Sequence, residues 1–427
     1  MDKARKKQHF DTSLDIRQLL SWANGYAHVA YLNPNSIDYP HGPFPHLLAV
    51  GANDIITSGT SPFFEKTKSG IENSKEWWFG YFGYDLKNEI ENLYSQNPSF
   101  IDFPEGMFFC PETLITFTEN GLEISSFRAP KEIFEEIKKT TATAEKELSC
   151  GVLLPRFSKK EYLETVKKLQ DHIVEGDIYE INLCQEFTAT GNVQNPVNFY
   201  LKLNEKSPAP FSAWLKIGKK HLLCASPERF IKKKGDKLIS QPIKGTIRRG
   251  EDDKEDQELK SLLFNDPKER AENLMIVDLV RNDLARSSVY GSVVPEEIFG
   301  IYGFRQVNQM ISTVTSQLRP GFSPIEAIRN AFPMGSMTGA PKIRMMELAE
   351  HYEKSKRGLY SGAVGFFDPE MDFDFNVVIR SIFLDEKSGR LSFQVGGAIT
   401  IDSIPEKEYE ECMLKASAIL SVLGISN

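Results

Sequence analysis

Histidine is scarce in this 427-residue chain, and the motifs of several large enzyme classes are missing. Its seven histidines include no pair at metal-ligand spacing and no HExxH, which argues against zinc hydrolysis. There is no GxSxG elbow and no GxGxxG that would open a dinucleotide-binding helix. The glycine stretch at 335–342 lacks the spacing of a phosphate-binding loop. What remains is the chemistry of lysine, arginine and carboxylates.

Cysteines are also few, and no apolar run is long enough to cross a membrane. The five cysteines are odd in number, lie far apart and form no CxxC, which is typical of reduced thiols in a cytoplasm. No apolar run reaches the roughly 18 residues that a membrane span needs. The basic start, MDKARKKQHF, is not followed by the apolar segment of a signal peptide. We therefore expect a cytoplasmic protein without a membrane partner.

Positive charge is in deficit. The formal net charge is −8, in an otherwise ordinary globular composition of 41% hydrophobic and 26% charged residues. An acidic chain is a poor match for the phosphate backbone, so we expect no nucleic-acid partner. An anionic substrate would need a local cluster of positive side chains or a metal ion.

The pattern of strand-like and helix-like segments changes near residue 150. Residues 1–150 are strand-rich and aromatic and are predicted to form one subdomain, with 151–427 as the catalytic region of a single integrated globular unit. In the second region strand-like segments mostly follow one another, which predicts an α+β fold of two stacked, mostly antiparallel sheets with helices packed outside, rather than a doubly wound fold. Helices are predicted at 132–147, 159–175 and 255–286, with capping boxes at Ser323 and Ser403.

The segment QPIKGTIRRG at 241–250 places Lys244 between a stiff proline and a permissive glycine. It follows a predicted hairpin with its turn near Gly235, in which facing residues have numbers that sum to about 470. Glu228 and Lys244 would then lie together at the open end of that hairpin. A surface ion pair is the commoner meaning of such a pair. The alternative is a nucleophilic amine beside an acid/base partner, and such an amine needs desolvation or a nearby cation to lose its proton.

Two predicted helices carry carboxylates without any histidine. Glu272 stands immediately before an apolar run, while Glu408, Glu411 and Lys415 share one face of the last helix. Solvated helix surfaces would explain these residues equally well. If the two helices meet, their oxygen ligands suit Mg²⁺, a hard cation that bridges anionic substrates.

Nine motifs, taken together in order and spacing, resemble the chorismate-utilising enzymes. This family includes anthranilate synthase, aminodeoxychorismate synthase component I, and isochorismate and salicylate synthases, and the resemblance is strong over residues 150–425. The motifs are GDIYEINLCQ (176–185), SPAPFSAWL (207–215), SPERF (226–230), QPIKGTIRRG (241–250), AENLMIVDLVRNDLAR (271–286), GSMTGAPK (335–342), YSGAVGFF (360–367), NVVIRS (376–381) and DSIPEKEYEEC (402–412).

Two positions indicate the branch of the family. Lys244 stands where aminodeoxychorismate synthase component I typically has lysine and anthranilate synthase has alanine. Glu180 stands where the water-adding isochorismate and salicylate synthases have a lysine. The resemblance therefore implies a transaminase-type amination of chorismate to 4-amino-4-deoxychorismate, on the route to p-aminobenzoate and folate. Anthranilate synthase and a non-catalytic binding relative remain the alternatives.

The resemblance also implies the roles of individual residues. Lys244 is the expected nucleophile and Glu228 the expected general acid. The expected Mg²⁺ ligands are Glu272, Glu408 and Glu411. The expected substrate-binding residues are Gly245, Thr246, Tyr360, Arg380, Gly396, Gly397 and Lys415.

Some features depart from the family, or are lacking. Gln309 replaces a histidine that is common in the family, and Ala398 replaces a glycine. No cysteine lies in a GxCxG setting, so we find no glutamine amidotransferase segment. A separate glutamine amidotransferase subunit that supplies ammonia is therefore the expected partner.

Overall fold

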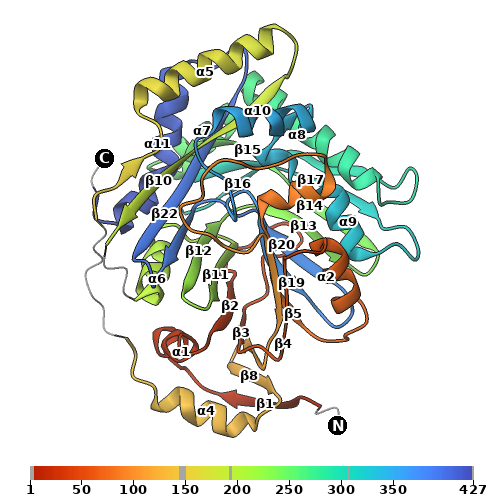
Figure 1. Cartoon of the computed structure of the whole chain (residues 1–427), viewed down its shortest axis with the longest axis vertical. Coiled ribbons are helices and arrows are strands. Elements are labelled where there is room, and N and C mark those ends of the chain that lie inside the picture. The colour runs from red at the N-terminus through yellow and green to blue at the C-terminus, as the bar shows by residue number, and fades with distance from the viewer. Residues whose placement is uncertain (1–3, 144–150, 192–194, 306, 426–427) are drawn as a thin grey trace.

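Two large β-sheets form the centre of the molecule (Figure 1). The computed structural model describes residues 4–143, 151–191, 195–305 and 307–425. One sheet has 12 strands and the other has 10, and every printed strand pair is antiparallel. Helices lie around the outside of the sheets, so the predicted α+β class is confirmed. None of the helices in these ranges is long and apolar enough to cross a membrane.

The 12-stranded sheet combines strands from the beginning, middle and end of the chain. Pairing of β2 with β11, for example Tyr31 with Trp214, joins its two halves. In spatial order its strands are β1 (Lys6–Asp11), β8 (Gly121–Ser126), β7 (Thr113–Thr118), β3 (Leu47–Val50), β2 (His28–Asn33), β11 (Phe211–Ile217), β12 (Lys220–Ser226), β21 (Ser381–Asp385), β22 (Arg390–Ile399), β10 (Glu180–Thr190) and β18 (Gly339–Ala340), with β9 (Leu154–Pro155) beside β10.

The 10-stranded sheet ends in β15, the strand that carries Lys244. Here too a strand from the first 150 residues, β5, pairs with one from the last hundred, β19. The division of the chain at residue 150 stays a prediction. The strands in order are β15 (Ile243–Arg248), β17 (Val307–Gln317), β14 (Lys237–Gln241), β13 (Arg229–Lys234), β20 (Phe373–Asn376), β19 (Ala363–Phe367), β5 (Trp78–Phe82), β6 (Gly106–Cys110) and β4 (Asp54–Thr57), with β16 (Val294–Gly303) beside β17.

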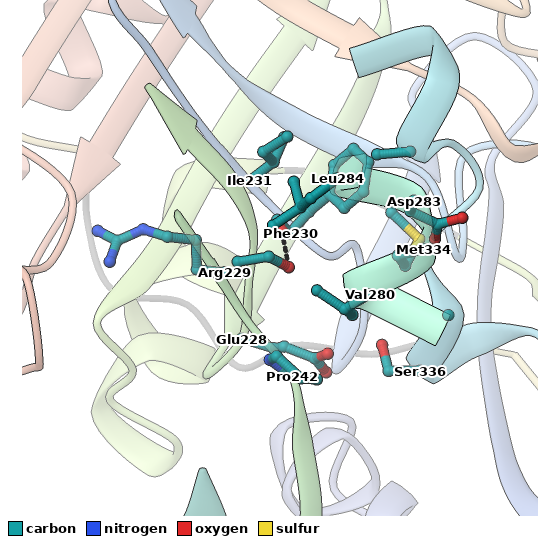
Figure 2. Close-up of a pocket in the computed structure, with 13 residues that line it drawn as sticks. Glu228, Arg229, Phe230, Ile231, Pro242, Val280, Asp283, Leu284, Met334 and Ser336 are labelled. Atoms are coloured by element: carbon teal, nitrogen blue, oxygen red, sulfur yellow. Dashed lines mark hydrogen bonds between the residues drawn. The ribbon is translucent and has the colours of Figure 1, made fainter. Parts of the chain in front are cut away.

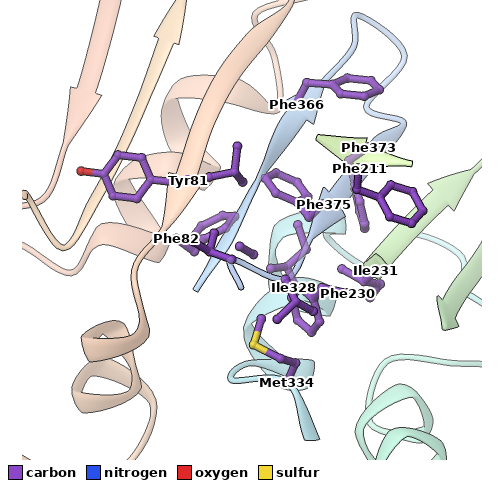
Figure 3. Packing of buried hydrophobic residues seen from close by; sticks show 14 of the residues in the cluster. Tyr81, Phe82, Phe211, Phe230, Ile231, Ile328, Met334, Phe366, Phe373 and Phe375 are labelled. Carbon is purple, nitrogen blue, oxygen red and sulfur yellow. The ribbon is translucent and has the colours of Figure 1, made fainter. Parts of the chain in front are cut away.

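Aromatic side chains fill the space between the two sheets. Figure 3 shows Phe82, Phe230 and Phe375 converging with aliphatic residues of the surrounding strands and helices. The rings of Phe82 and Phe375 lie 5.5 Å apart, centroid to centroid. Large buried rings contribute strongly to a core, so this packing holds the sheets in a fixed relation to each other. That relation decides which residues of one sheet meet those of the other.

The helices cover the outer faces of the sheets, and two of them position the candidate site. α11 packs on β22 and against α5, while α8 packs on β15 and β17. The helices are α1 (Ile16–Ala23), α2 (Phe63–Ile71), α3 (Lys87–Ile90), α4 (Pro130–Lys139), α5 (Lys159–Val174), α6 (Pro196–Lys206), α7 (Asp253–Asn265), α8 (Pro267–Ala285), α9 (Pro324–Ala331), α10 (Lys342–Tyr352) and α11 (Pro405–Val422).

The single helix predicted at 255–286 is wrong, because the structure breaks it in two. α7 ends at Asn265 and α8 begins at Pro267. Proline has no N–H to continue the helical ladder but fits the first position of a new helix. Asp266 caps that helix by accepting hydrogen bonds from the backbone N–H groups of Lys268 (2.9 Å) and Glu269 (3.1 Å). This new start sets the direction in which α8 presents Glu272.

Three other expectations about helix limits have mixed outcomes. The helix predicted at 132–147 ends at Lys139 instead, and 144–147 lie outside the described residues, as does Cys150. The cap at Ser323 is confirmed, since its side chain accepts from the backbone N–H of Glu326. The capping box at Ser403 is wrong, because α11 is capped at Ile404 and the Ser403 hydroxyl donates to Glu408 instead.

Candidate active site

Lys244 reaches across from one sheet to the other. Its Nζ donates a hydrogen bond to Oε1 of Glu180, the first residue of β10, at 2.5 Å. The two side chains are only 11% and 2% exposed. The second carboxylate oxygen of Glu180, Oε2, is buried and has no hydrogen-bond partner among the described residues. The structure therefore shows a buried ion pair whose carboxylate is only half satisfied.

The contact between Lys244 and Glu228 that the hairpin register suggested is replaced by this pair. The register itself is confirmed, since Arg229 lies opposite Gln241. Glu228 acts on Lys244 only through its charge, while the hydrogen bond goes to Glu180. From the sequence, position 180 served only to separate branches of the family. A hydrogen-bond partner 64 residues away in another sheet leaves no local signal.

The charge on Lys244 follows from its neighbours. Burial is the strongest single influence and favours the neutral amine, but the carboxylates of Glu180, Glu272 and Glu411 together outweigh it and raise the pKa of Lys244. In the ligand-free protein the amine is therefore protonated. Any nucleophilic role requires a group that removes this proton.

Glu228 lines a small cavity (Figure 2). Val280, Leu284 and Ser336 are among the residues that line this cavity, and Figure 2 shows the carboxyl group of Glu228 next to Ser336. Burial raises the pKa of Glu228 to about 7, against the opposing effects of the nearby Ser336 hydroxyl group and the positive charge of Lys244. A carboxyl group with this pKa carries its proton at neutral pH about half of the time, which suits a general acid.

Arg380 offers a positive charge near Glu228. It lies between β20 and β21 with a left-handed backbone, φ 51°. Burial lowers the pKa of Arg380, while the charge of Glu228 opposes that effect. Within the described part of the chain, its guanidinium group has no hydrogen-bond or ion-pair partner. A half-buried guanidinium group in this state is a suitable receptor for a carboxylate.

The three predicted metal ligands lie on two helices that face each other. The ammonium group of Lys268 lies 3.8 Å from Oε1 of Glu272 on α8 and 3.7 Å from Oε1 of Glu408 on α11. Glu411 pairs with Lys415 at 2.8 Å. Oε1 of Glu272 is buried without a hydrogen bond, and burial raises the pKa of this residue to about 7.

These carboxylates therefore attract a cation, and their oxygen-only donor set fits a hard divalent ion. Their ligand atoms are not as closely grouped as those of His172, Glu175 and Asp177, the one such trio within 4.8 Å among the described residues. Both ring nitrogens of His172 are already hydrogen-bonded, to Asp177 and to Tyr352, and that trio lies near the surface. The trio is therefore a weaker candidate metal site than the three glutamates.

Two of the predicted substrate-binding glycines adjoin these helices. Lys415 donates a hydrogen bond to the carbonyl oxygen of Gly396 at 3.1 Å. A Cβ atom on Gly396 would come within 2.6 Å of the Leu183 carbonyl oxygen, and one on Gly397 would lie 3.6 Å from Oε2 of Glu408. The missing side chain of Gly396 thus allows β22 to approach β10 closely, whereas a Cβ atom at Gly397 would make only an ordinary van der Waals contact.

The remaining predicted substrate-binding residues differ in their surroundings. Gly245 has φ 93° and faces Glu269, whereas Thr246 is exposed and lies opposite Gln309. Gln309, which replaces the family's histidine, is buried, and its Oε1 has no partner among the described residues. Tyr360 is 3% exposed, and burial raises the pKa of its hydroxyl group. Contacts of these residues with a substrate stay predictions.

Comparison with known proteins places this site in a family. A model of the chorismate binding enzyme family matches residues 41–421. The chain belongs to the chorismate binding enzymes. Aminodeoxychorismate synthase component 1 of Bacillus subtilis (strain 168) is 33% identical over 363 residues, which cover 81% of this chain and 77% of that protein.

Two further relatives show the range of this family. The probable chloroplastic aminodeoxychorismate synthase of Oryza sativa subsp. japonica is 34% identical over 404 residues, and the match covers 84% of this chain but only 45% of that protein. The crystal structure of anthranilate synthase component I from Streptococcus pneumoniae TIGR4 has a TM-score of 0.78 at 25% identity, covering 90% of this chain and 94% of that one. Proteins named aminodeoxychorismate synthase and a protein named anthranilate synthase are thus both similar to this chain.

Proposed function

We propose that this chorismate binding enzyme is an aminodeoxychorismate synthase component I. It converts chorismate and ammonia to 4-amino-4-deoxychorismate, a precursor of p-aminobenzoate. The observation that supports this choice over anthranilate synthase is Lys244, a buried amine paired with the carboxylate of Glu180, where anthranilate synthases have alanine. The relative from Bacillus subtilis carries the name of this activity.

In the proposed reaction, Lys244 and Glu228 have complementary roles. The neutral amine of Lys244 attacks C2 of chorismate, both ring double bonds shift by one position toward C4, and the C4 hydroxyl group leaves with the proton of Glu228. Ammonia then adds at C4 and expels the Lys244 amine. The pKa of about 7 at Glu228 lets the same group give and regain a proton near neutral pH.

The other predicted residues would bind the substrate and a Mg²⁺ ion. Arg380 would bind one carboxylate of chorismate, and Lys415 with the backbone at Gly396 and Gly397 would orient the other anionic group. Gly245, Thr246 and Tyr360 would complete the pocket wall. Glu272, Glu408 and Glu411 would hold Mg²⁺, which supplies positive charge against a substrate carboxylate.

The product distinguishes the proposed function from its alternatives. We expect the purified chain, given chorismate, ammonium and Mg²⁺, to form 4-amino-4-deoxychorismate, identified by chromatography and mass spectrometry. Anthranilate would instead support anthranilate synthase, and unconsumed chorismate would support a binding relative. Addition of a glutamine amidotransferase subunit should allow glutamine to replace ammonium, which tests the proposed partner.

Removal of a proposed metal ligand should weaken Mg²⁺ binding. Glu272→Gln keeps the shape of the side chain but removes its charge, and we expect Mg²⁺ affinity to fall about 10–100-fold or more, by analogy with other metal sites. Isothermal titration calorimetry with Mg²⁺ measures this without any turnover. Glu410→Gln, an exposed change on the same helix as Glu408, is the matched control. Equal affinity in both variants would contradict the assignment.

A further inference from the structure

Glu180 is held in place by β18 (Gly339–Ala340), a short strand to which the proposed reaction gives no task. GSMTGAPK at 335–342 supplies β18, which pairs with the start of β10 so that Glu180 lies opposite Ala340. The backbone N–H of Tyr179 donates to the Ala340 carbonyl oxygen at 2.8 Å. A Cβ atom on Gly339 would lie 2.1 Å from the carbonyl oxygen of Glu180, so only glycine permits this approach. The backbone of Glu180 is therefore fixed where its side chain meets Lys244.

The carboxylate of Glu180 has one oxygen more than its ion pair uses. Oε1 accepts the hydrogen bond from Lys244, while Oε2 is buried and unpartnered among the described residues. An unsatisfied buried oxygen costs free energy, and a carboxylate that only balanced the charge of a lysine would be cheaper at the surface. The arrangement is understandable if the carboxylate takes part in the reaction.

We propose that Glu180 is the proton acceptor for Lys244. A proton moves from the ammonium group of Lys244 along the existing hydrogen bond to Oε1 of Glu180, leaving a neutral amine and a neutral carboxyl group. The freed electron pair forms the N–C2 bond with chorismate. When ammonia later displaces the lysine, the departing amine takes the proton back from Glu180. This inference rests on the proposed function, because it assigns the proton of the proposed nucleophile.

The other charged groups near the pair have different tasks or positions. Glu180 is the sole hydrogen-bond partner of the Lys244 amine in the described part of the chain. Glu228 is assigned to the leaving hydroxyl group, and Glu272 and Glu411 to the cation. Proton transfer within a buried pair also removes two charges from a poorly solvated place, which burial favours. The charged groups that act on this pair or its neighbours are Glu228, Glu269, Glu272, Glu411, Lys268 and Arg380.

Glu180→Gln separates this role from a purely positioning one, because the two predict opposite results. The amide keeps a hydrogen-bond acceptor for the lysine but cannot take up its proton. If Glu180 only holds the ammonium group, losing its charge lowers the pKa of Lys244 and makes the lysine react as fast or faster at neutral pH. If Glu180 accepts the proton, the reaction slows although the pKa of Lys244 has fallen.

The experiment compares the parent, Glu180→Gln and Glu180→Asp with Glu186→Gln, a buried control on the same strand. Rapid quenching with mass spectrometry measures the formation of the Lys244 adduct from chorismate without ammonia, and steady-state assays give kcat and KM. For Glu180→Gln we expect adduct formation and kcat about 100-fold slower, in the range for general base catalysis, with KM little changed. Glu180→Asp should recover part of the rate. Equal or faster adduct formation in Glu180→Gln overturns the proposal.

A second measurement needs no chorismate. Carbamylation of Lys244 by cyanate, followed across pH by peptide mass spectrometry, reports the fraction of free amine. We expect the midpoint of the pH dependence of carbamylation to move to lower pH in Glu180→Gln and to stay unchanged in Glu186→Gln. An unchanged midpoint in both variants overturns the pairing of Lys244 with Glu180. If the parent forms no 4-amino-4-deoxychorismate, the proposed function fails together with this role. If the parent aminates chorismate and Glu180→Gln does so equally fast, only the role of Glu180 fails.

Discussion

Lys244→Ala is expected to lower formation of 4-amino-4-deoxychorismate by about 10³-fold or more, because it removes the proposed covalent nucleophile. The methyl group also leaves C2 of chorismate open to ammonia itself, so any residual product should be the isomer aminated at C2. Quantitative chromatography of both amines, with chorismate, ammonium and Mg²⁺ at saturation, measures the effect.

A charge-preserving variant separates nucleophilicity from electrostatics. Lys244→Arg keeps a positive group near Glu180, but guanidinium does not deprotonate in this pH range. We expect it to be as inactive as the alanine variant while it binds chorismate more tightly than that variant does. Mass spectrometry with chorismate and no ammonia should show an adduct on the parent alone. An active Lys244→Arg enzyme would contradict a covalent role for the lysine.

Glu228→Gln is expected to reduce kcat by about 10²–10⁴-fold, because the amide cannot protonate the departing hydroxyl group. Burial raises the pKa of Glu228 to about 7, so the acid is present below that pH and is lost as the pH rises through it. The parent should therefore lose activity on the alkaline side of about pH 7, and the residual activity of Glu228→Gln should lack this decrease. Rate profiles between pH 5 and 9 test both points.

Ser336→Ala provides a graded control for the assignment of Glu228. The nearby hydroxyl group of Ser336 lowers the pKa of Glu228, so its removal should raise that pKa and move the alkaline decrease to higher pH. The size of kcat at low pH should change little, because the acid itself remains. A decrease that stays at the same pH in Ser336→Ala would mean that another group controls it.

Local sequence patterns predicted those parts of the fold that depend on neighbouring residues. The hairpin at Gly235 has the predicted register, and α5 follows Ser158, whose side chain and Glu161 form a capping box. The patterns did not predict the break at Pro267, since apolar and charged residues continue at helical spacing on both sides of it. A proline within a helical pattern was the available signal.

The candidate site, like the fold, could be predicted only in part from local sequence patterns. Carboxylates on two helices could be recognised in the sequence, and α8 and α11 do approach each other through Lys268. How closely the two helices approach depends on how each helix packs on its sheet. The spacing of residues within one helix contains no information about that packing. The state of Lys244 could not be read from its own motif either, because the groups that control its charge come from β10, α8 and α11.

The residues alone were enough to predict the kinds of side chain available for chemistry, the α+β class and the turns and strands around Lys244, since these depend on short-range geometry and on periodic burial. That Glu180, rather than Glu228, receives the hydrogen bond of that lysine became visible only in the folded chain. The packed aromatic core fixes one sheet over the other, and β18 fixes the start of β10. A contact between residues 64 positions apart is set by that packing and not by either segment alone.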